Sequence, residues 1–236
     1  MNLIKHLANL GYGSRKEMQK LIRMGAVTDA SGAVLDDGAA VTHDEIRLQG
    51  KALDPDFGVV LLMNKPTGFV CSHKDRGQLV YDLLPARFVE RKPVLSTIGR
   101  LDSDTSGLLL FTDDGDFLHK IISPKNHVAK IYEVTCARPL EPGYSEIFAS
   151  GTLVLKDEKD ALKPAFLEAT SETTARITLY EGRYHQVRRM FAAVGNHVES
   201  LHRPQMGDLT LGDLKPGRWR VLSAEERAGL LKPVKD

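Results

Sequence analysis

The sequence is poor in several features that define special classes of protein. Its 236 residues include two cysteines and one tryptophan, and 32 lysine and arginine residues nearly balance 31 aspartate and glutamate residues. Cys71 and Cys136 are too few and too far apart for a disulfide framework, so we expect free thiols in a reducing compartment. No stretch approaches the roughly 18 apolar residues of a membrane helix. The near-neutral charge carries no overall signature of nucleic-acid binding.

Export signals and metal-binding motifs are also missing. Lys5 and His6 interrupt the apolar residues of the N-terminus, and no small-residue cleavage site follows them. We therefore expect a cytoplasmic protein with no membrane partner. The eight histidines show no metal-ligand spacing, and Cys71 with His73 is an isolated pair, so neither a metal nor a cofactor is predicted.

Positive charge is concentrated in the first 25 residues. Leucines at helical spacing predict a short helix that ends at Gly11, and Ser14 with Glu17 forms a capping box that starts a second helix. One face of this second helix carries Lys16, Lys20 and Arg23, with Arg15 at its start. Such a face is either solvated surface or a binding surface for RNA phosphates, and its composition alone favours the first.

The remaining pattern predicts an α+β fold in two parts. Short strands near 26–28, 33–35 and 46–48 complete a small module of two helices and a sheet over residues 1–50, and residues 51–58 indicate a linker. A second domain is expected over 59–232, with a mixed, mainly antiparallel sheet. Its predicted strands and helices are as follows: strands 59–63, 108–111, 131–135, 166–169 and 175–179; helices near 80–90, 114–122, 143–150 and 186–195.

The most informative segment runs from Gly99 to Leu110 and reads GRLDSDTSGLLL. It places Arg100 and Asp102 in a polar loop directly before a short apolar strand. An Asp in this position is either a reactive carboxylate or the first residue of an ordinary Asx-turn, and the spacing does not separate the two.

This segment resembles the active-site motif of the RNA pseudouridine synthases, in the branch that acts on small-subunit ribosomal RNA. Four further segments resemble the family and stand along the chain in the family's order. They are Asn64–Gly68, Lys130–Val134, Glu181–Met190 and a final strand at Pro216–Leu222. The N-terminal module is similar to an RNA-binding module of a small-subunit ribosomal protein. The likeness covers nearly the whole chain.

The resemblance implies isomerisation of uridine to pseudouridine, a reaction in which no atoms are gained or lost and which needs no cofactor. Asp102 is then the catalytic carboxylate, either as a nucleophile on the sugar or as a base that removes a sugar proton. Arg188 would pair with Asp102 and keep it ionised. Tyr132 would stack on the target base, although a tyrosine on a strand is more often a packing residue.

The target base has to leave its helix to reach Asp102. Arg100 is expected to fill the gap that the base leaves, because its planar cation can stack on bases and meet phosphate. Phosphate contacts are expected for Arg183 and Arg189, and Lys65 is assigned to the RNA surface, although a lysine there is as often only exposed. A surface ion pair is the competing role for Arg188.

The resemblance further implies 16S ribosomal RNA as the partner, free or in an assembling small subunit, with a target of the pseudouridine-516 type and a monomeric enzyme. Two alternatives stay open at this point. One is a pseudouridine synthase for 23S ribosomal RNA. The other is a non-catalytic RNA-binding factor in ribosome assembly, although such a protein would be expected to have lost Asp102.

Overall fold

The computed structural model describes residues 1–123 and 128–231, and within them the fold is α+β as predicted. Residue 232, the expected end of the second domain, lies outside this part. The helices are α1 Leu3–Asn9, α2 Arg15–Arg23, η1 His43–Glu45, η2 Val80–Leu83, α3 Ala86–Val89, α4 Gly115–Ile122, α5 Tyr144–Ala149, α6 Gln186–Ala193 and α7 Ala224–Leu230. The strands are β1 Val27–Thr28, β2 Arg47–Leu48, β3 Lys51–Ala52, β4 Val60–Lys65, β5 Phe69–Val70, β6 Gln78–Leu79, β7 Ser96–Ile98, β8 Thr105–Thr112, β9 Lys130–Cys136, β10 Phe166–Ala169, β11 Thr174–Leu179, β12 Val198–Met206, β13 Leu209–Thr210 and β14 Trp219–Val221.

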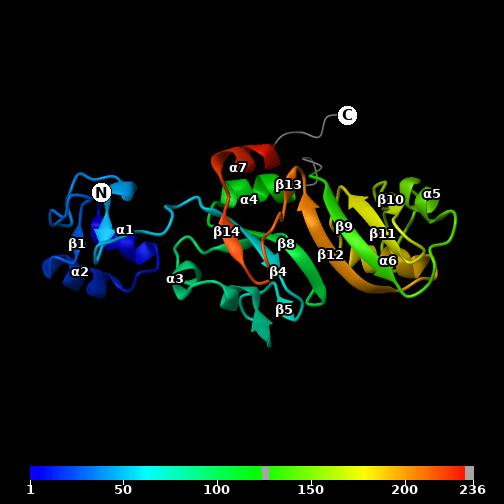
Figure 1. Cartoon of the computed structure of the whole chain (residues 1–236), viewed down its shortest axis with the longest axis horizontal. Helices are drawn as coiled ribbons and strands as arrows, with labels where there is room; N and C mark the ends of the chain where they lie inside the picture. Colours follow the sequence, from blue (N-terminus) through cyan, green and yellow to red (C-terminus); the bar gives the residue numbers. More distant parts are fainter. Residues whose placement is uncertain (124–127, 232–236) are drawn as a thin grey trace.

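The N-terminal helices pack against a small antiparallel sheet of β1, β2 and β3 at one end of the molecule (Figure 1). The capping box is present: the Ser14 side chain accepts from the Glu17 N–H, and the Glu17 carboxylate accepts from the Ser14 N–H. Apolar residues of both helices share a core with Val27 and Ile46. Two details differ from expectation, because 33–35 forms a single bridge at Val34 and the expected linker begins with β3.

The large sheet is mixed and mainly antiparallel, as the sequence indicates. Its main order is β10-β11-β9-β12-β8-β4-β14, with β7 added on β8 and β13 on β12. The pair β12 and β8 runs parallel, while the other pairs of this sheet are antiparallel. The sheet spans the centre and the far end of the molecule (Figure 1).

Both faces of the central strands are buried, which explains the apolar stretches 60–63 in β4 and 108–111 in β8. On β4, Val60 and Leu62 face a core that includes Phe117 of α4 and Leu230 of α7. Leu61 on the same strand faces the opposite core, with residues of α5 and α6. Figure 1 shows α4 and α7 together over one face of the sheet.

Several elements depart from the sequence-based boundaries. The helix expected near 80–90 is divided into η2 and α3, because Pro85 restricts the residue before it and supplies no N–H to continue a helix. Strand β12 and helix α7 were not predicted, since charged and polar residues interrupt the apolar pattern of both. Within the described residues, no helix is long and apolar enough to cross a membrane.

The N-terminal module and the segment after β3 contact the part of the chain that begins with β4 directly. The Arg87 guanidinium of α3 pairs with the Asp54 carboxylate, and the Lys92 N–H donates to the Asn9 carbonyl at 2.8 Å. The backbone approach is close: a Cβ at Gly11 would lie 2.0 Å from the Arg87 carbonyl oxygen, so this position requires glycine.

Candidate active site

Asp102 lies in the loop between β7 and β8, just before the first residue of the interior strand β8. Gly99 begins the loop with φ +72°, a conformation that most side chains disfavour. The Thr105 N–H donates to the Asp102 carbonyl at 3.1 Å and closes the turn before β8. This leaves the Asp102 carboxylate 29% exposed, neither buried in the core nor free on the surface.

Lys65, the last residue of β4, holds the backbone of this loop. Its Nζ donates to the carbonyl oxygens of Asp102 (3.0 Å), Ser103 (3.3 Å), Thr105 (2.8 Å) and its neighbour Pro66 (3.1 Å). The side chain is fully buried, and burial lowers the pKa of its ammonium. The assignment of Lys65 to the RNA surface is therefore wrong. Lys65 ends a strand that begins with four apolar residues, and this position was the sequence signal for its burial.

The side chain that contacts the Asp102 carboxylate is His185. Its Nε2 lies 3.2 Å from Asp102 Oδ1, and it is the N-cap of α6, in a left-handed conformation with φ 49°. Gln186 fixes this turn, since its side chain accepts from the Arg183 N–H and donates to Glu181. His185 lies within the segment Glu181–Met190 that resembles the family, but no role was predicted for it.

Arg188 lies near the loop but does not pair with Asp102. Its Nη2 is 2.9 Å from Asp104 Oδ2, and its Nη1 donates to the Val198 carbonyl at 2.8 Å. Within residues 1–123 and 128–231, no arginine forms an ion pair with Asp102. The expected contact is thus shifted by two residues: α6 reaches the loop, and the guanidinium binds the outer carboxylate while the imidazole of His185 binds the inner one.

Tyr132 of β9 forms one wall of the site and is 8% exposed. Its hydroxyl accepts a hydrogen bond from Arg203 Nη1 at 3.2 Å, and the Arg203 guanidinium also donates to the Leu108 carbonyl. The buried Arg203 on β12 was not among the predicted site residues. Gly107 permits this arrangement, because a Cβ there would lie 2.3 Å from the Arg203 carbonyl oxygen.

These groups surround a cleft of about 720 Å³, a size typical of small-molecule sites. Asp102, Tyr132 and His185 line it together with Arg100, which is exposed at its edge. Four cations (Arg100, Lys130, Arg183 and Arg203) and three carboxylates (Asp75, Asp102 and Asp104) border the cleft. Burial lowers the pKa of the Lys130 ammonium to about 8.

The two arginines that were expected to contact phosphates, Arg183 and Arg189, form ion pairs and hydrogen bonds within the protein instead. Arg183 pairs with Glu158 and Glu181 and donates to two backbone carbonyls, and Arg189 pairs with Glu158 at 2.8 Å and donates to two more. Both arginines thus anchor the segment around Glu158 beside the cleft, contrary to the sequence-based expectation. Arg15, Lys16, Lys20 and Arg23 are exposed on α2, as that expectation requires.

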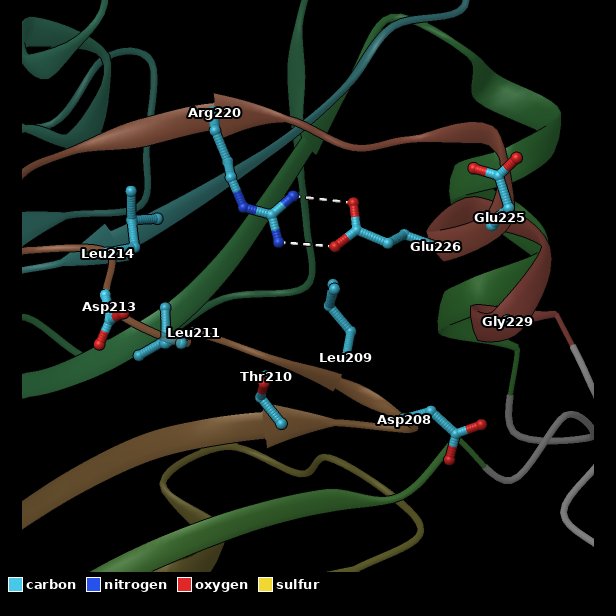
Figure 2. A pocket seen from close by; sticks show the side chains of 11 residues that line it. Asp208, Leu209, Thr210, Leu211, Asp213, Leu214, Arg220, Glu225, Glu226 and Gly229 are labelled. Carbon is cyan, nitrogen blue, oxygen red and sulfur yellow. Dashed lines mark hydrogen bonds and ion pairs between the residues drawn. The ribbon is translucent and has the colours of Figure 1, made fainter.

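A second cleft, of about 730 Å³, lies between β13 and α7 (Figure 2). Its arginine, Arg220, forms a two-pronged ion pair with Glu226, with N–O distances of 2.6 and 2.8 Å. Asp208, Asp213 and Glu225 add further negative charge around it. An acidic cleft repels RNA phosphates, so we do not assign the chemistry to it.

The first cleft therefore defines a class of site. It offers a partly exposed carboxylate, an aromatic wall and a cationic rim, which suits an aspartate-dependent reaction on a planar, polyanionic substrate. Exposed Tyr184 is stacked on His185 at 3.8 Å between ring centroids, which places a further aromatic face beside the carboxylate.

Comparison with known proteins agrees with this class. The model of the RNA pseudouridylate synthase family matches residues 59–193. The ribosomal small subunit pseudouridine synthase A of Pasteurella multocida is 43% identical over 97% of this chain and 98% of its own, and that of Escherichia coli K12 is 41% identical over 98% and 100%. A crystal structure of a pseudouridylate synthase has a TM-score of 0.68, with 38% identity over 97% of this chain and 98% of that one. The chain belongs to the RNA pseudouridylate synthase family and is a pseudouridine synthase.

Proposed function

We propose that this enzyme isomerises a uridine of 16S ribosomal RNA to pseudouridine, at a site of the pseudouridine-516 type, with Asp102 as the catalytic carboxylate. The observation that carries the proposal is the position of Asp102 in the cleft, 3.2 Å from His185 and on the same lining as Tyr132. The relatives that match along their full length are small-subunit enzymes by name, which supports the choice of RNA.

The reaction breaks the bond between C1′ of the ribose and N1 of uracil, rotates the base and joins C1′ to C5. The C5 proton is lost and N1 gains a proton, so the composition is unchanged. Asp102 acts on the sugar, either as a nucleophile or as the base that removes a sugar proton. The cleft has room for the detached uracil, and Tyr132 provides a flat wall along which the ring can turn.

Lys65 and His185 position the carboxylate for this step. Lys65 fixes the backbone of the loop through its carbonyl oxygens, and His185 holds one oxygen of the carboxylate. Proper placement matters, since a shift of about 1 Å at a reacting group can reduce the rate by about 10²-fold. Arg188 takes part indirectly by holding Asp104, two residues further along the loop.

Base flipping supplies the target. Removing a base from its stack costs about a few kcal/mol, and the enzyme has to offset this cost. Arg100 is exposed at the rim of the cleft, where its guanidinium can fill the vacated position in the RNA. The face of α2 that carries Lys16, Lys20 and Arg23 would hold the RNA at a second, distant point.

The activity is tested with uridine-labelled 16S and 23S transcripts, by release of tritium from C5. The proposal expects turnover on 16S RNA and at least about 10²-fold less on 23S RNA. Preference for 23S RNA would favour the first alternative. A protein that binds 16S RNA but releases no tritium from free 16S RNA or from 16S RNA in an assembly intermediate would instead be a non-catalytic assembly factor.

The RNA surface is tested separately by substituting Lys16, Lys20 and Arg23 with Gln. Each lost phosphate contact should lower the slope of log K against log salt concentration by about 0.7 to 0.9. The matched control is a Gln substitution at Lys51, an exposed lysine on β3. An unchanged slope in the triple variant would show that this face is merely solvated.

A further inference from the structure

Two histidines and an aspartate meet between the N-terminal module and the segment that leads to β4. His6 belongs to α1, His43 begins η1, and Asp56 lies in the connecting segment. His6 Nε2 is 3.0 Å from His43 Nδ1, and Asp56 Oδ1 is 4.0 Å from the first nitrogen and 3.7 Å from the second. The histidine side chains are 9% and 10% exposed, while the aspartate is half-exposed.

The hydrogen bonds of His43 determine which of its nitrogens faces this cluster with a lone pair. His43 Nε2 lies 2.9 Å from the Asp54 carbonyl oxygen, which can only accept a hydrogen bond. The proton of neutral His43 is therefore on Nε2, and Nδ1 accepts a hydrogen bond from His6 Nε2; a metal ion would take the place of that shared proton. Histidine ligands in metal sites are commonly oriented in this way: one ring nitrogen binds the metal, and the other donates a hydrogen bond to a backbone carbonyl.

The spacing of the three ligand atoms suits a tetrahedral metal ion. Zinc bonds of about 2.0 to 2.1 Å to nitrogen and oxygen place neighbouring ligand atoms about 3.3 Å apart. The His–His separation is about 0.3 Å shorter than this value, and the two separations from Asp56 are about 0.4 and 0.7 Å longer, so shifts of less than about 1 Å bring all three atoms into range. Two imidazoles favour zinc and similar transition metals over magnesium or calcium.

Positive charge from Arg91 and from the N-terminus lies close to this cluster. Arg91 approaches the segment and donates to the carbonyl oxygens of Pro55 and Asp56. Its guanidinium is paired with Asp113, at 3.1 Å and with both side chains fully buried. Asp113 thus offsets part of the Arg91 charge, and the hydrogen bonds of Arg91 hold Asp56 in place on the segment.

From this geometry we propose that His6, His43 and Asp56 form a Zn²⁺ site, with a fourth position open to water beside the half-exposed Asp56. The site joins two elements of the N-terminal module to the connecting segment, so its role is to clamp the module in position. The ligands lie far apart in the sequence, which is why spacing alone predicts no zinc site. None of the three lines the catalytic cleft.

The full-length protein, freed of metal by dialysis against a chelator, is titrated with Zn²⁺ alone and followed by calorimetry. One ion per chain is expected, together with a rise in the unfolding temperature that the chelator reverses. His43→Gln should lower the affinity at least about 100-fold, because one of three protein ligands is lost. His119→Gln is the matched control, since His119 is an exposed histidine on α4.

Asp56→Asn provides a second variant that should fold, because the residue is half-exposed. It should also weaken Zn²⁺ binding and abolish most of the thermal shift, while activity on RNA without Zn²⁺ stays near that of the metal-free wild type. The proposal is overturned if the wild type binds no Zn²⁺, or if His43→Gln and Asp56→Asn bind it as tightly as His119→Gln.

Discussion

The two clefts of the catalytic part are nearly equal in volume and opposite in chemistry. In the cleft beside Asp102, Arg183 and Arg203 are engaged inside the protein, but Arg100 is exposed and donates to no described residue. In the cleft of Figure 2, the arginine is fully engaged with Glu226 and the remaining charges are acidic. The difference shows that volume does not identify a site for RNA. A site for RNA is identified by positive charge that is not already paired within the protein.

The comparison is tested most severely by removing the carboxylate from the first cleft. Asp102→Asn keeps the shape of the side chain and removes its ionised oxygen, so tritium release should fall by at least about 10³-fold. Folding and RNA affinity should change little. Asp116→Asn is the control, because Asp116 is an exposed aspartate on α4 outside the cleft and its loss should leave the activity near that of the wild type.

The next largest effect is expected beneath the loop. Lys65→Met leaves buried carbonyl oxygens without their donor, which should cost about 2–4 kcal/mol in the free energy of unfolding. The displaced loop should also lower turnover by about 10²-fold. Urea unfolding and single-turnover kinetics measure the two effects. Unchanged kinetics in a folded variant would show that Lys65 stabilises the protein without positioning Asp102.

Lys130, which lines the first cleft, should make the stability of the protein depend on pH. The pKa of Lys130 is about 8 in the folded chain and about 10.4 when unfolded, so between these values the unfolded state binds more protons and stability rises with pH. Lys130→Met removes a partly buried charge and should therefore stabilise the protein at pH 7. The gain should be only about 1 kcal/mol, because the Lys130 side chain remains partly hydrated. The substitution should also flatten the rise between pH 8 and pH 10 in urea unfolding, and a parallel curve would contradict this origin of the shift.

The smallest effect is expected in the second cleft. Glu226→Gln breaks the ion pair with Arg220, which is partly exposed, so the loss of stability should be about 1 kcal/mol or less. Activity should stay within about twofold of the wild type in the tritium assay. A loss comparable to that of Asp102→Asn would reverse the assignment of the two clefts.

Local patterns predicted most of the regular structure because local forces decide it. The capping box at Ser14 and the apolar run of β8 follow from side chains a few residues apart. Strand β12 was missed because its polar residues, such as Arg203, find partners inside the sheet. No local rule shows that a charged side chain will be satisfied by distant carbonyls.

The same reason explains the partial success at the site. The segment around Asp102 was recognisable from its motif, and the structure brings it together with Tyr132 and the start of α6 in one cleft. The partners of individual charges were not predictable. Arg188 and His185 stand three residues apart on the same turn, and the orientation of α6 alone decides that the imidazole meets Asp102 and the guanidinium meets Asp104.

The most direct test of the central claim is a map of pseudouridines in ribosomal RNA by carbodiimide labelling. It compares cells that lack this protein with cells that carry either the wild type or Asp102→Asn. We predict one pseudouridine in 16S RNA that the wild type restores and the variant does not. Restoration by the variant, or an unchanged map in cells without the protein, would contradict the claim that Asp102 carries out this modification.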